Sequence, residues 1–188
     1  DVYKRQNLEY ENLDILGSRL SAQMYYRDYF TRFTPFDARA VATRGGNVDQ
    51  IMQNSEVFGS RLTLRTPLGE SGSTELVWGG DYNQERSDMP LDVFDPAAYD
   101  ASGGLVFDKI GKLTYMPPLR TRSAGAFAQL QHRFDEHWSV DGGLRYEYST
   151  AEFDDFIPLS ESAAASPVAV KGGDIHYDAV LSNLGIVY

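Results

Sequence analysis

The chain has 188 residues and no cysteine. This absence excludes a disulfide framework, a thiolate metal site and a cysteine nucleophile. Basic residues are also few, with 17 lysines and arginines against 27 aspartates and glutamates and a formal net charge of -10. Because binding to nucleic-acid phosphates requires clustered basic side chains, we expect no nucleic-acid partner.

Long hydrophobic runs are missing as well. No stretch approaches the roughly 20 consecutive apolar residues of a membrane-spanning helix. The sequence is still compatible with a membrane β-barrel, because barrel strands alternate apolar and polar residues and are polar on average. The opening residues DVYKRQ lack the pattern of a signal peptide, and we expect residues 1–6 to be a non-native or disordered start.

Motifs for catalysis are missing too. The sequence has three histidines, but neither a nucleophile-elbow serine nor the glycine-rich patterns that bind phosphates or dinucleotides. His132 and His137 flank an acidic turn without a recognised metal-ligand spacing, and the acidic loop from Asp88 to Asp100 lacks the spacing of a calcium-binding loop. We therefore expect no enzyme, no resident metal and no cofactor.

Bulky apolar residues alternate with polar ones along much of the chain. In the stretch RFDEHWSVDGGLRYEYS, Trp138 and Leu144 share one parity, while Asp141, Arg145 and Glu147 share the other. The 12 tyrosines and 10 phenylalanines also suit strands. This pattern predicts strands with two different faces. The predicted strands cover residues 7–12, 19–33, 57–65, 75–85, 123–134, 138–149 and 174–188.

The connections between these strands alternate in length. Short polar links occur near residues 16–17, 66–74 and 134–138, and long links occur at residues 34–50, 87–119 and 152–173. Outer-membrane barrels carry short periplasmic turns and long extracellular loops. The second predicted strand is also about twice as long as the five or six residues typical of a soluble sandwich strand. Both features favour a membrane barrel.

The membrane interpretation assigns the two faces. An arginine on the lipid side near the bilayer middle would cost about 2–4 kcal/mol, so Arg145 is expected to face the lumen and Leu144 the lipid. The predicted lumen-lining residues are Arg61, Arg65, Asp81, Gln129, Arg145 and Glu147.

The strand count limits the fold. About seven strands are predicted, whereas a bacterial single-chain barrel has an even number of about eight or more. We therefore predict an all-β fold, an antiparallel up-and-down meander in which residues 7–188 form a segment of a larger transmembrane β-barrel. The outer edges of such a segment would need further strands as partners.

Four stretches, in this order, resemble the barrel of TonB-dependent siderophore receptors. They are NSEVFGSRLTLRTPL, LVWGGDYNQERSDMPLDVFDPAAYDASGG, AGAFAQLQHRFDEHWSVDGGLRYEYS and DAVLSNLGIVY. The resemblance implies a plugged barrel of about 22 strands. It implies import of ferric siderophores across the outer membrane of a Gram-negative bacterium, with TonB as the energy source. The plug and the segment that contacts TonB are then expected outside this chain, iron is expected only as a bound ferric chelate, and outer-membrane lipid is expected around the barrel.

In such a receptor the long loops would bind the ligand first. Aromatic side chains suit the organic shell of an iron chelate, and arginines suit its anionic groups, although the same aromatics can fold a loop onto itself. The candidate ligand-binding residues are Arg39, Arg44, Phe94, Tyr99, Phe107, Tyr115 and Arg120. Two other functions stay open at this point, a small structural or adhesive outer-membrane barrel and a soluble carbohydrate-binding β-sandwich.

Overall fold

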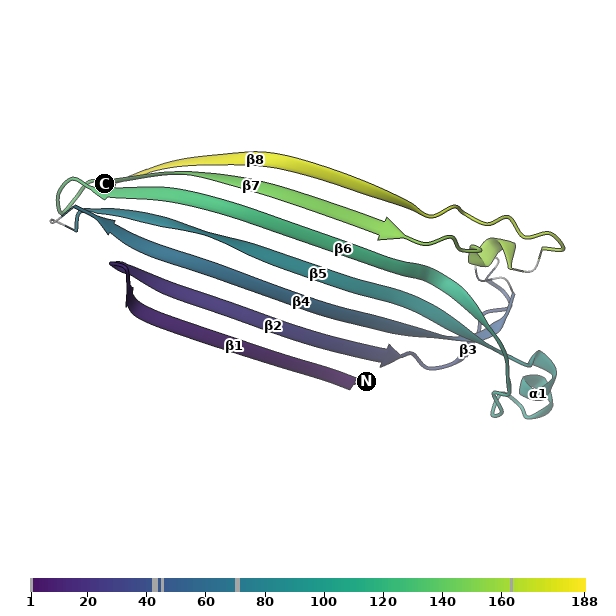
Figure 1. The fold of residues 1–188 in the computed structure, drawn as a ribbon. Helices are drawn as coiled ribbons and strands as arrows, with labels where there is room; N and C mark the ends of the chain where they lie inside the picture. Colours follow the sequence, from purple (N-terminus) through teal and green to yellow (C-terminus); the bar gives the residue numbers. More distant parts are fainter. Residues whose placement is uncertain (1, 42–43, 45, 70–71, 163) are drawn as a thin grey trace.

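One antiparallel sheet makes up most of the molecule (Figure 1). The computed structural model describes residues 2–188 apart from residues 42–43, 45, 70–71 and 163. Its strands follow one another in the order β1-β2-β4-β5-β6-β7-β8, with the short β3 paired to β4, which confirms the predicted up-and-down meander. The strands are β1 (Val2–Ile15), β2 (Ser18–Arg32), β3 (Phe36–Asp37), β4 (Val48–Leu68), β5 (Thr74–Phe94), β6 (Lys109–Arg133), β7 (Ser139–Phe153) and β8 (Gly173–Val187).

The first strand starts earlier than the sequence pattern predicts. β1 begins at Val2, whose backbone lies opposite Phe30 of β2, so residues 2–6 are part of the sheet rather than a disordered start. The pairing between β1 and β2 continues without a shift up to Asn12. Hydrogen bonds to the backbone of β2 therefore hold residues 2–6 in a strand, although apolar and polar side chains hardly alternate there.

The connection between β5 and β6 is shorter than predicted. Only residues 95–108 lie outside the two strands, whereas the sequence predicts a loop over residues 87–119. The prolines and aspartates of that range are ordinary loop signals. Here the sheet accommodates them through irregular register between Ser87 and Pro90, as bulges do when they absorb an extra residue.

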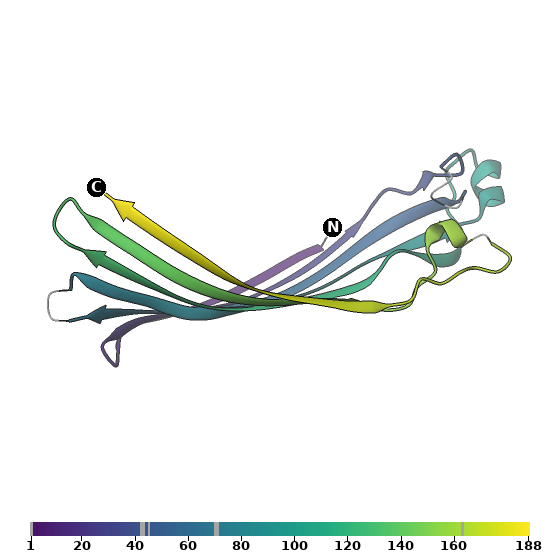
Figure 2. The same ribbon diagram turned by 90° about the horizontal axis from the view of Figure 1, so that it is seen from above.

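The two ends of the sheet differ in their connections (Figure 1). At the short-turn end, Leu16 and Gly17 join β1 to β2 with φ values of 52° and 76°, as a two-residue hairpin turn with positive φ at both positions requires. The long-loop end carries the connections through residues 33–47, 95–108 and 154–172. Seen from above, the strands bow along their length between these two ends (Figure 2).

The helical segments are short and lie in the long loops. Helix α1 (Pro96–Ala101) begins after Asp95, whose carboxylate accepts a hydrogen bond from the backbone N–H of Ala97 at 2.9 Å. The 3₁₀ segment η2 (Leu159–Glu161) lies in the loop after β7. Within the described part of the chain, no helix has the length and apolar character needed to cross a membrane.

Cross-strand pairing sorts the side chains onto two faces, because directly opposed residues share a face and successive residues alternate. Arg61 lies opposite Asp81, for example, and Leu62 lies opposite Gly80. We call one side the polar face and the other the apolar face. The polar face carries Arg61, Arg65, Asp81, Gln129, Arg145 and Glu147, and the apolar face carries Met24, Phe58, Leu62, Trp78, Leu144 and Tyr146.

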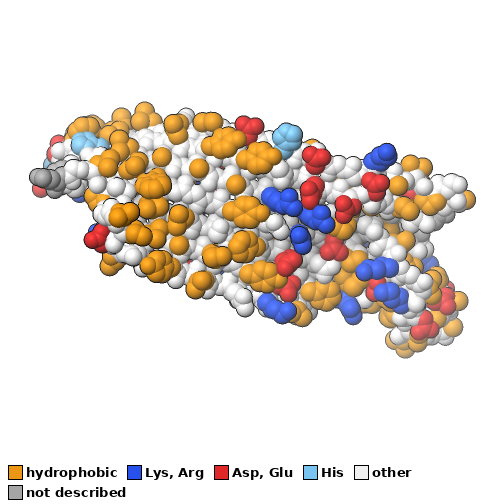
Figure 3. Space-filling model, viewed as in Figure 1, with side chains coloured by type: hydrophobic (Ala, Val, Ile, Leu, Met, Phe, Trp, Pro, Cys, Tyr) orange, Lys and Arg blue, Asp and Glu red, His pale blue; other side chains and the backbone are white. Residues whose placement is uncertain are grey.

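The apolar face is the more exposed of the two. Leu144 and Tyr146 are 60% and 47% exposed, whereas the side chain of Arg145 between them is 29% exposed. A large exposed apolar surface is unfavourable in water and suits contact with lipid. The apolar residues of β4 run from Phe58 to Leu68, which matches the about 9–11 residues of a tilted membrane-crossing strand. Figure 3 shows this apolar band over the part of the face nearest the short-turn end.

A small hydrophobic core lies at the long-loop end. Leu91 and Val93 of β5 and Leu159 of η2 are buried together, and Ile51 and Leu113 pack against them. The core thus fastens the loop after β7 onto the ends of the central strands. It orders the loops, whereas the middle of the sheet has an exposed apolar face.

A charge in the middle of the apolar band tests the assignment of the two faces. We expect Leu144→Arg to lower the free energy of unfolding by about 2–4 kcal/mol in phospholipid vesicles, because the guanidinium would face hydrocarbon. Denaturant titration of the protein in its full native reading frame measures this value. Asn183→Arg is the matched control, since Asn183 lies on the polar face opposite Gly143, one position from Leu144. Equal destabilisation by both variants would contradict the assignment.

Candidate functional site

Arg145 of β7 reaches across β6 to Asp81 of β5. Its Nη1 and Nη2 donate to the two carboxylate oxygens at 2.8 and 3.0 Å, and its Nε donates to Glu147 at 3.2 Å. Two parallel bonds from one guanidinium to one carboxylate form a strong and directional ion pair. The side chains of Arg145 and Asp81 are only 29% and 23% exposed, which reduces screening by solvent.

Gly125 of β6 has no side chain, which leaves room for the Arg145–Asp81 ion pair. Gly125 lies directly opposite Asp81 on one side and Glu147 on the other. A Cβ atom at this position would lie 2.3 Å from Nη2 of Arg145. A residue without a side chain is therefore required in β6 for an arginine of β7 to bind an aspartate of β5.

Tyr25 of β2 crosses a second glycine in the same way. Its hydroxyl donates to Oδ1 of Asn83 in β5 at 2.9 Å, and the ring passes over Gly59 of β4. A Cβ at Gly59 would lie 2.2 Å from the ring. Two glycines on the polar face thus let long side chains link strands that are not neighbours.

The other predicted lumen-lining residues lie on the same face. Arg65 forms an ion pair with Glu75 at 3.2 Å, and Gln129 donates to Asp141 at 3.1 Å. Asn183 donates to the same carboxylate at 3.3 Å. The structure therefore gathers all six predicted residues on the polar face, and their role in a lumen stays a prediction.

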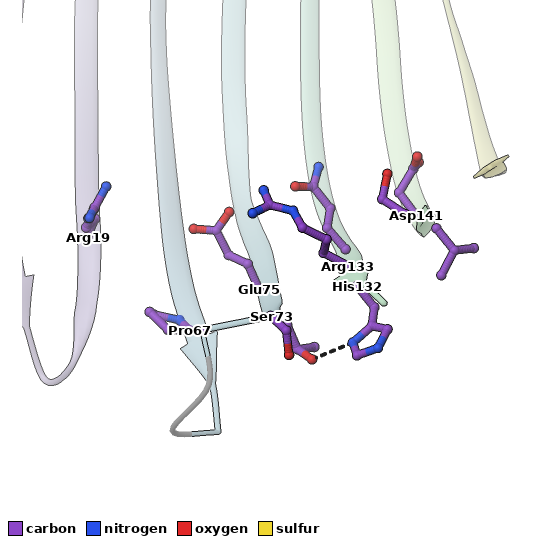
Figure 4. Close-up of a pocket in the computed structure, with 12 residues that line it drawn as sticks. Arg19, Pro67, Ser73, Glu75, His132, Arg133 and Asp141 are labelled. Carbon is purple, nitrogen blue, oxygen red and sulfur yellow. Dashed lines mark hydrogen bonds between the residues drawn. The ribbon is translucent and has the colours of Figure 1, made fainter. Parts of the chain in front are cut away.

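At the short-turn end the polar face is hollowed by a pocket of about 510 Å³. Glu75, Arg133 and Asp141 stand on the neighbouring strands β5, β6 and β7, and Arg19 stands apart on β2 (Figure 4). Both signs of charge line the pocket. Such a lining suits a polar partner rather than an apolar small molecule.

The histidines of the acidic turn have separate partners. His132 shares a hydrogen bond with Thr74 at 2.8 Å, and its ring packs against Phe134. The ring of His137 stacks on Tyr188. Across the described residues, no three side chains of the metal-ligating types His, Asp and Glu come together in a group that could hold an ion.

At the long-loop end, Arg39 joins the loop before β4 to helix α1. Its guanidinium donates to Asp37 at 2.7 Å and to both oxygens of Asp100 at 2.8 Å. It also lies 5.7 Å from the ring centre of Tyr99. The hydrogen bonds from Arg39 hold the pKa of Asp37 at about 2 and lower the pKa of Asp100. Both carboxylates are therefore charged over the whole neutral range.

Arg44 is enclosed at the same end of the sheet. Its guanidinium lies over the rings of Phe36 and Tyr115 at 4.5 and 5.5 Å, and Nη2 donates to Asp49 at 2.6 Å. Asp49 is fully buried, and burial raises its pKa although the charge of Arg44 opposes this effect. Oδ2 of Asp49 has no hydrogen-bond partner among the described residues.

The remaining loop candidates pack on one another or point elsewhere. The ring centre of Phe107 lies 5.4 Å from the ring centres of both Phe94 and Tyr99. Arg120 lies on the apolar face, where it pairs with Glu152 at 3.2 Å. Six of the seven candidates therefore meet at the long-loop end in intramolecular contacts, Arg120 is separate, and ligand binding by any of them stays a prediction.

Several partners in these contacts were missed by sequence reasoning. Isolated glycines within strands mark places where another group approaches the backbone closely, so Gly59 and Gly125 were the available signal. No sequence signal shows which side chain crosses them. The partners not predicted as site residues include Tyr25, Phe36, Asp37, Asp49, Glu75, Asn83, Asp100, Asp141, Glu152 and Asn183.

The glycine beneath Arg145 provides a test of the polar-face network. We expect Gly125→Ala to displace the guanidinium from Asp81 and to lower the free energy of unfolding by about 1.5–3 kcal/mol, the usual contribution of hydrogen bonds to charged groups. Denaturant titration measures the loss. In an Asp81→Asn background the same change should cost clearly less.

Gly142→Ala is the control for this experiment. The nearest atom to its added Cβ lies 3.7 Å away, which is ordinary contact, so little change is expected. Additive losses for Gly125→Ala and Asp81→Asn would contradict a shared interaction.

Acid titration tests the link made by Arg39. Arg39 reaches α1 through Asp100, whose folded pKa it lowers as it lowers that of Asp37, so the contact is complete above the usual carboxyl pKa and is lost only as the pH falls below that range. Hydrogen exchange of residues 95–104 should therefore be alike at about pH 7 and about pH 4, after correction for the intrinsic rate. Arg39→Gln should raise exchange at both pH values. Faster exchange of the unchanged protein at the lower pH would contradict the assignment.

Comparison with known proteins gives relatives along nearly the whole chain. The ferric aerobactin receptor of Klebsiella pneumoniae is 30% identical over 187 residues, which is 96% of this chain and 25% of that protein. The rhizobactin receptor of Rhizobium meliloti (strain 1021) is 27% identical over 97% of this chain and 25% of its own length. The chain thus spans about a quarter of the length of these relatives.

Solved structures show the same fold. The copper transporter OprC matches 98% of this chain and 27% of its own chain with a TM-score of 0.71 at 13% identity. The ferric yersiniabactin uptake receptor FyuA from Yersinia pestis matches 98% of this chain and 25% of its own with a TM-score of 0.61 at 14% identity. A family model described as "TonB dependent receptor-like, beta-barrel" matches residues 2–188. The chain therefore belongs to the β-barrel family of TonB-dependent receptors.

Proposed function

We propose that this chain is part of an outer-membrane receptor that imports a ferric siderophore into a Gram-negative bacterium. The observation that carries the proposal is the match of nearly the whole chain to siderophore receptors, with 30% identity to the ferric aerobactin receptor. TonB-dependent receptors are outer-membrane proteins by family. In this proposal the apolar face contacts lipid and the polar face lines the lumen.

A lumen lined by the polar face suits the passage of a charged chelate. Arg145, Asp81 and Glu147 offer both signs of charge within one hydrogen-bonded group. Each charge already has a partner, so none presents an isolated charge that would trap an ion. Passage would follow once the plug is displaced, through contact of TonB with a part of the receptor beyond this chain.

The long-loop end is proposed as the site of ligand capture. Arg39 and Arg44 hold the loops in defined positions through their carboxylate partners, which lowers the cost of ordering them when a ligand binds. Tyr99 and Phe107 supply aromatic surface beside Arg39. A chelate with anionic groups and an organic shell would match this combination.

The family consists of transport receptors, and we assign no catalytic role to the chain. Iron is the cargo, carried within the chelate, and the proposal includes no resident metal or cofactor. The expected partners are the ferric siderophore, TonB and membrane lipid.

Uptake of radiolabelled iron tests the transport proposal. We expect the full native reading frame, expressed in a host without its own siderophore receptors, to restore uptake of ferric aerobactin in a TonB-dependent way. Lack of TonB-dependent uptake of every ferric siderophore in a panel that includes ferric aerobactin and ferric rhizobactin would contradict the proposal. A TonB-deficient host is the control for passive leakage.

A loop replacement tests the capture site. Exchange of residues 95–108 for a two-residue turn removes α1 and Phe107, so we expect at least about tenfold weaker chelate binding with normal barrel assembly. Equilibrium binding of the iron chelate and heat-modifiable gel migration measure the two properties. Leu16→Asn at the short-turn end is the control and should leave binding unchanged. Unaltered binding after the loop exchange would exclude this loop.

A further inference from the structure

A row of charged residues crosses the sheet on the apolar face, where the apolar band ends towards the long-loop end. Its members occupy directly opposed positions in seven successive strands, and we call them the charged row. Charged residues make up only 23% of the chain, so chance alone would rarely place one in every strand along a single row. Figure 3 shows acidic and basic side chains together across the sheet at this level. From β1 to β8 the members are Lys4, Asp28, Glu56, Arg86, Arg120, Glu152 and Asp174.

The signs of charge in the row follow a regular order. Asp28 has Lys4 on one side and Glu56 on the other. Arg86 has Glu56 on one side and Arg120 on the other. Every member with two neighbours in the row thus has one neighbour of its own sign and one of the opposite sign. Because directly opposed like charges repel and opposite charges attract, each of these residues has one attracting neighbour to offset the repelling one.

The ion pairs of the charged row lie at the surface. Lys4 forms an ion pair with Asp28 at 3.3 Å, and Arg120 forms one with Glu152 at 3.2 Å. The carboxylate of Glu152 also lies 3.7 Å from Arg122, which is next to the row on the same face. Exposed ion pairs add little to stability one by one. The regular order of the row therefore needs another explanation than the strength of its contacts.

The charged row favours one register of the strands over its nearest alternatives. A shift of two residues between neighbouring strands keeps every side chain on its face, because side chains alternate with a period of two. The alternation of apolar and polar residues therefore does not oppose such a shift. Between β4 and β5, however, a shift of two residues would place Glu56 opposite Gln84 or Asp88 instead of Arg86. The attracting neighbour of Glu56 would be lost in either direction.

Asp174 is the member of the row that lacks an attracting neighbour. It lies in β8, the outermost strand of the sheet, and its only neighbour in the row is Glu152. Among the residues that the structure describes, none forms an ion pair with Asp174, and this includes His176 on the same face of β8. The chain belongs to a β-barrel family and spans about a quarter of its relatives, and a closed barrel pairs the edge of every strand.

We propose that the strand that pairs with the free edge of β8, in the part of the protein outside these residues, places a lysine or arginine directly opposite Asp174. This basic residue continues the charged row and supplies the attracting neighbour that Asp174 lacks. The pair favours one register between β8 and the next strand. The inference depends on the barrel fold and is independent of the transported ligand.

Disulfide cross-linking in the full native reading frame identifies the residue opposite Asp174. The described chain contributes no cysteine, so Asp174→Cys can be combined with single cysteines along the next strand in a background freed of any others. Directly opposed residues have Cβ atoms about 4.5–5.5 Å apart and should cross-link most efficiently. We expect the native residue at that position to be lysine or arginine. Val180→Cys, which leaves Asp174 in place, is the control and should report the same register. A neutral or acidic residue opposite Asp174 would overturn the inference.

A double-mutant cycle tests whether the two opposed residues interact. We expect replacement of the basic residue by glutamine to lower the folding equilibrium constant, and to lower it about two- to fivefold less in an Asp174→Asn background. Denaturant titration of the full native reading frame in phospholipid vesicles measures both losses. Lys4→Gln with Asp28→Asn is the matched reference, because this ion pair belongs to the same row. Additive losses for the pair at Asp174 would overturn the inference.

Discussion

Hydrogen bonds between neighbouring backbones fix the side of the sheet on which each residue lies. From β1 to β8 the strands pair in antiparallel fashion over most of their length. A slip of one residue in any pair would move every polar side chain of that strand to the apolar face. The same bonds satisfy the backbone where no water is present, which is the condition for crossing a bilayer. The cross-strand backbone hydrogen bonds therefore do two things: they determine the face on which each side chain lies, and they satisfy the backbone polar groups as a bilayer requires.

Two arginines, one on the polar face and one in the loops, are held by partners on other elements. Arg145 joins β7 to β5, and Arg39 joins the loop before β4 to α1. A half-buried charge is costly unless it is paired and hydrogen-bonded, so each contact favours one arrangement of the elements it joins. The ion pairs in the sheet fix the positions of its strands relative to one another, and those at the long-loop end fix the positions of the loops.

The sequence predicted the strands well because alternation is a local property. Leu144 and Arg145 are neighbours with opposite polarity, and this contrast is enough to assign their faces. Strand ends were predicted less well, since Asp92 and Pro117 look like loop residues but lie within β5 and β6. The network of Arg145 with Asp81 was beyond sequence reasoning, because it depends on register across three strands. All six predicted polar-face residues were nevertheless placed together.

The absence of a side chain at Gly125, where the Arg145 guanidinium lies, has a consequence for the evolution of the protein. The contact across β6 requires an acidic residue at position 81, glycine at 125 and arginine at 145, and the three are far apart in the sequence. Once one of them is replaced, the other two lose their reason to be kept. Among homologous receptors these three positions should therefore change as a group, and their covariation would record a contact between strands that are not adjacent.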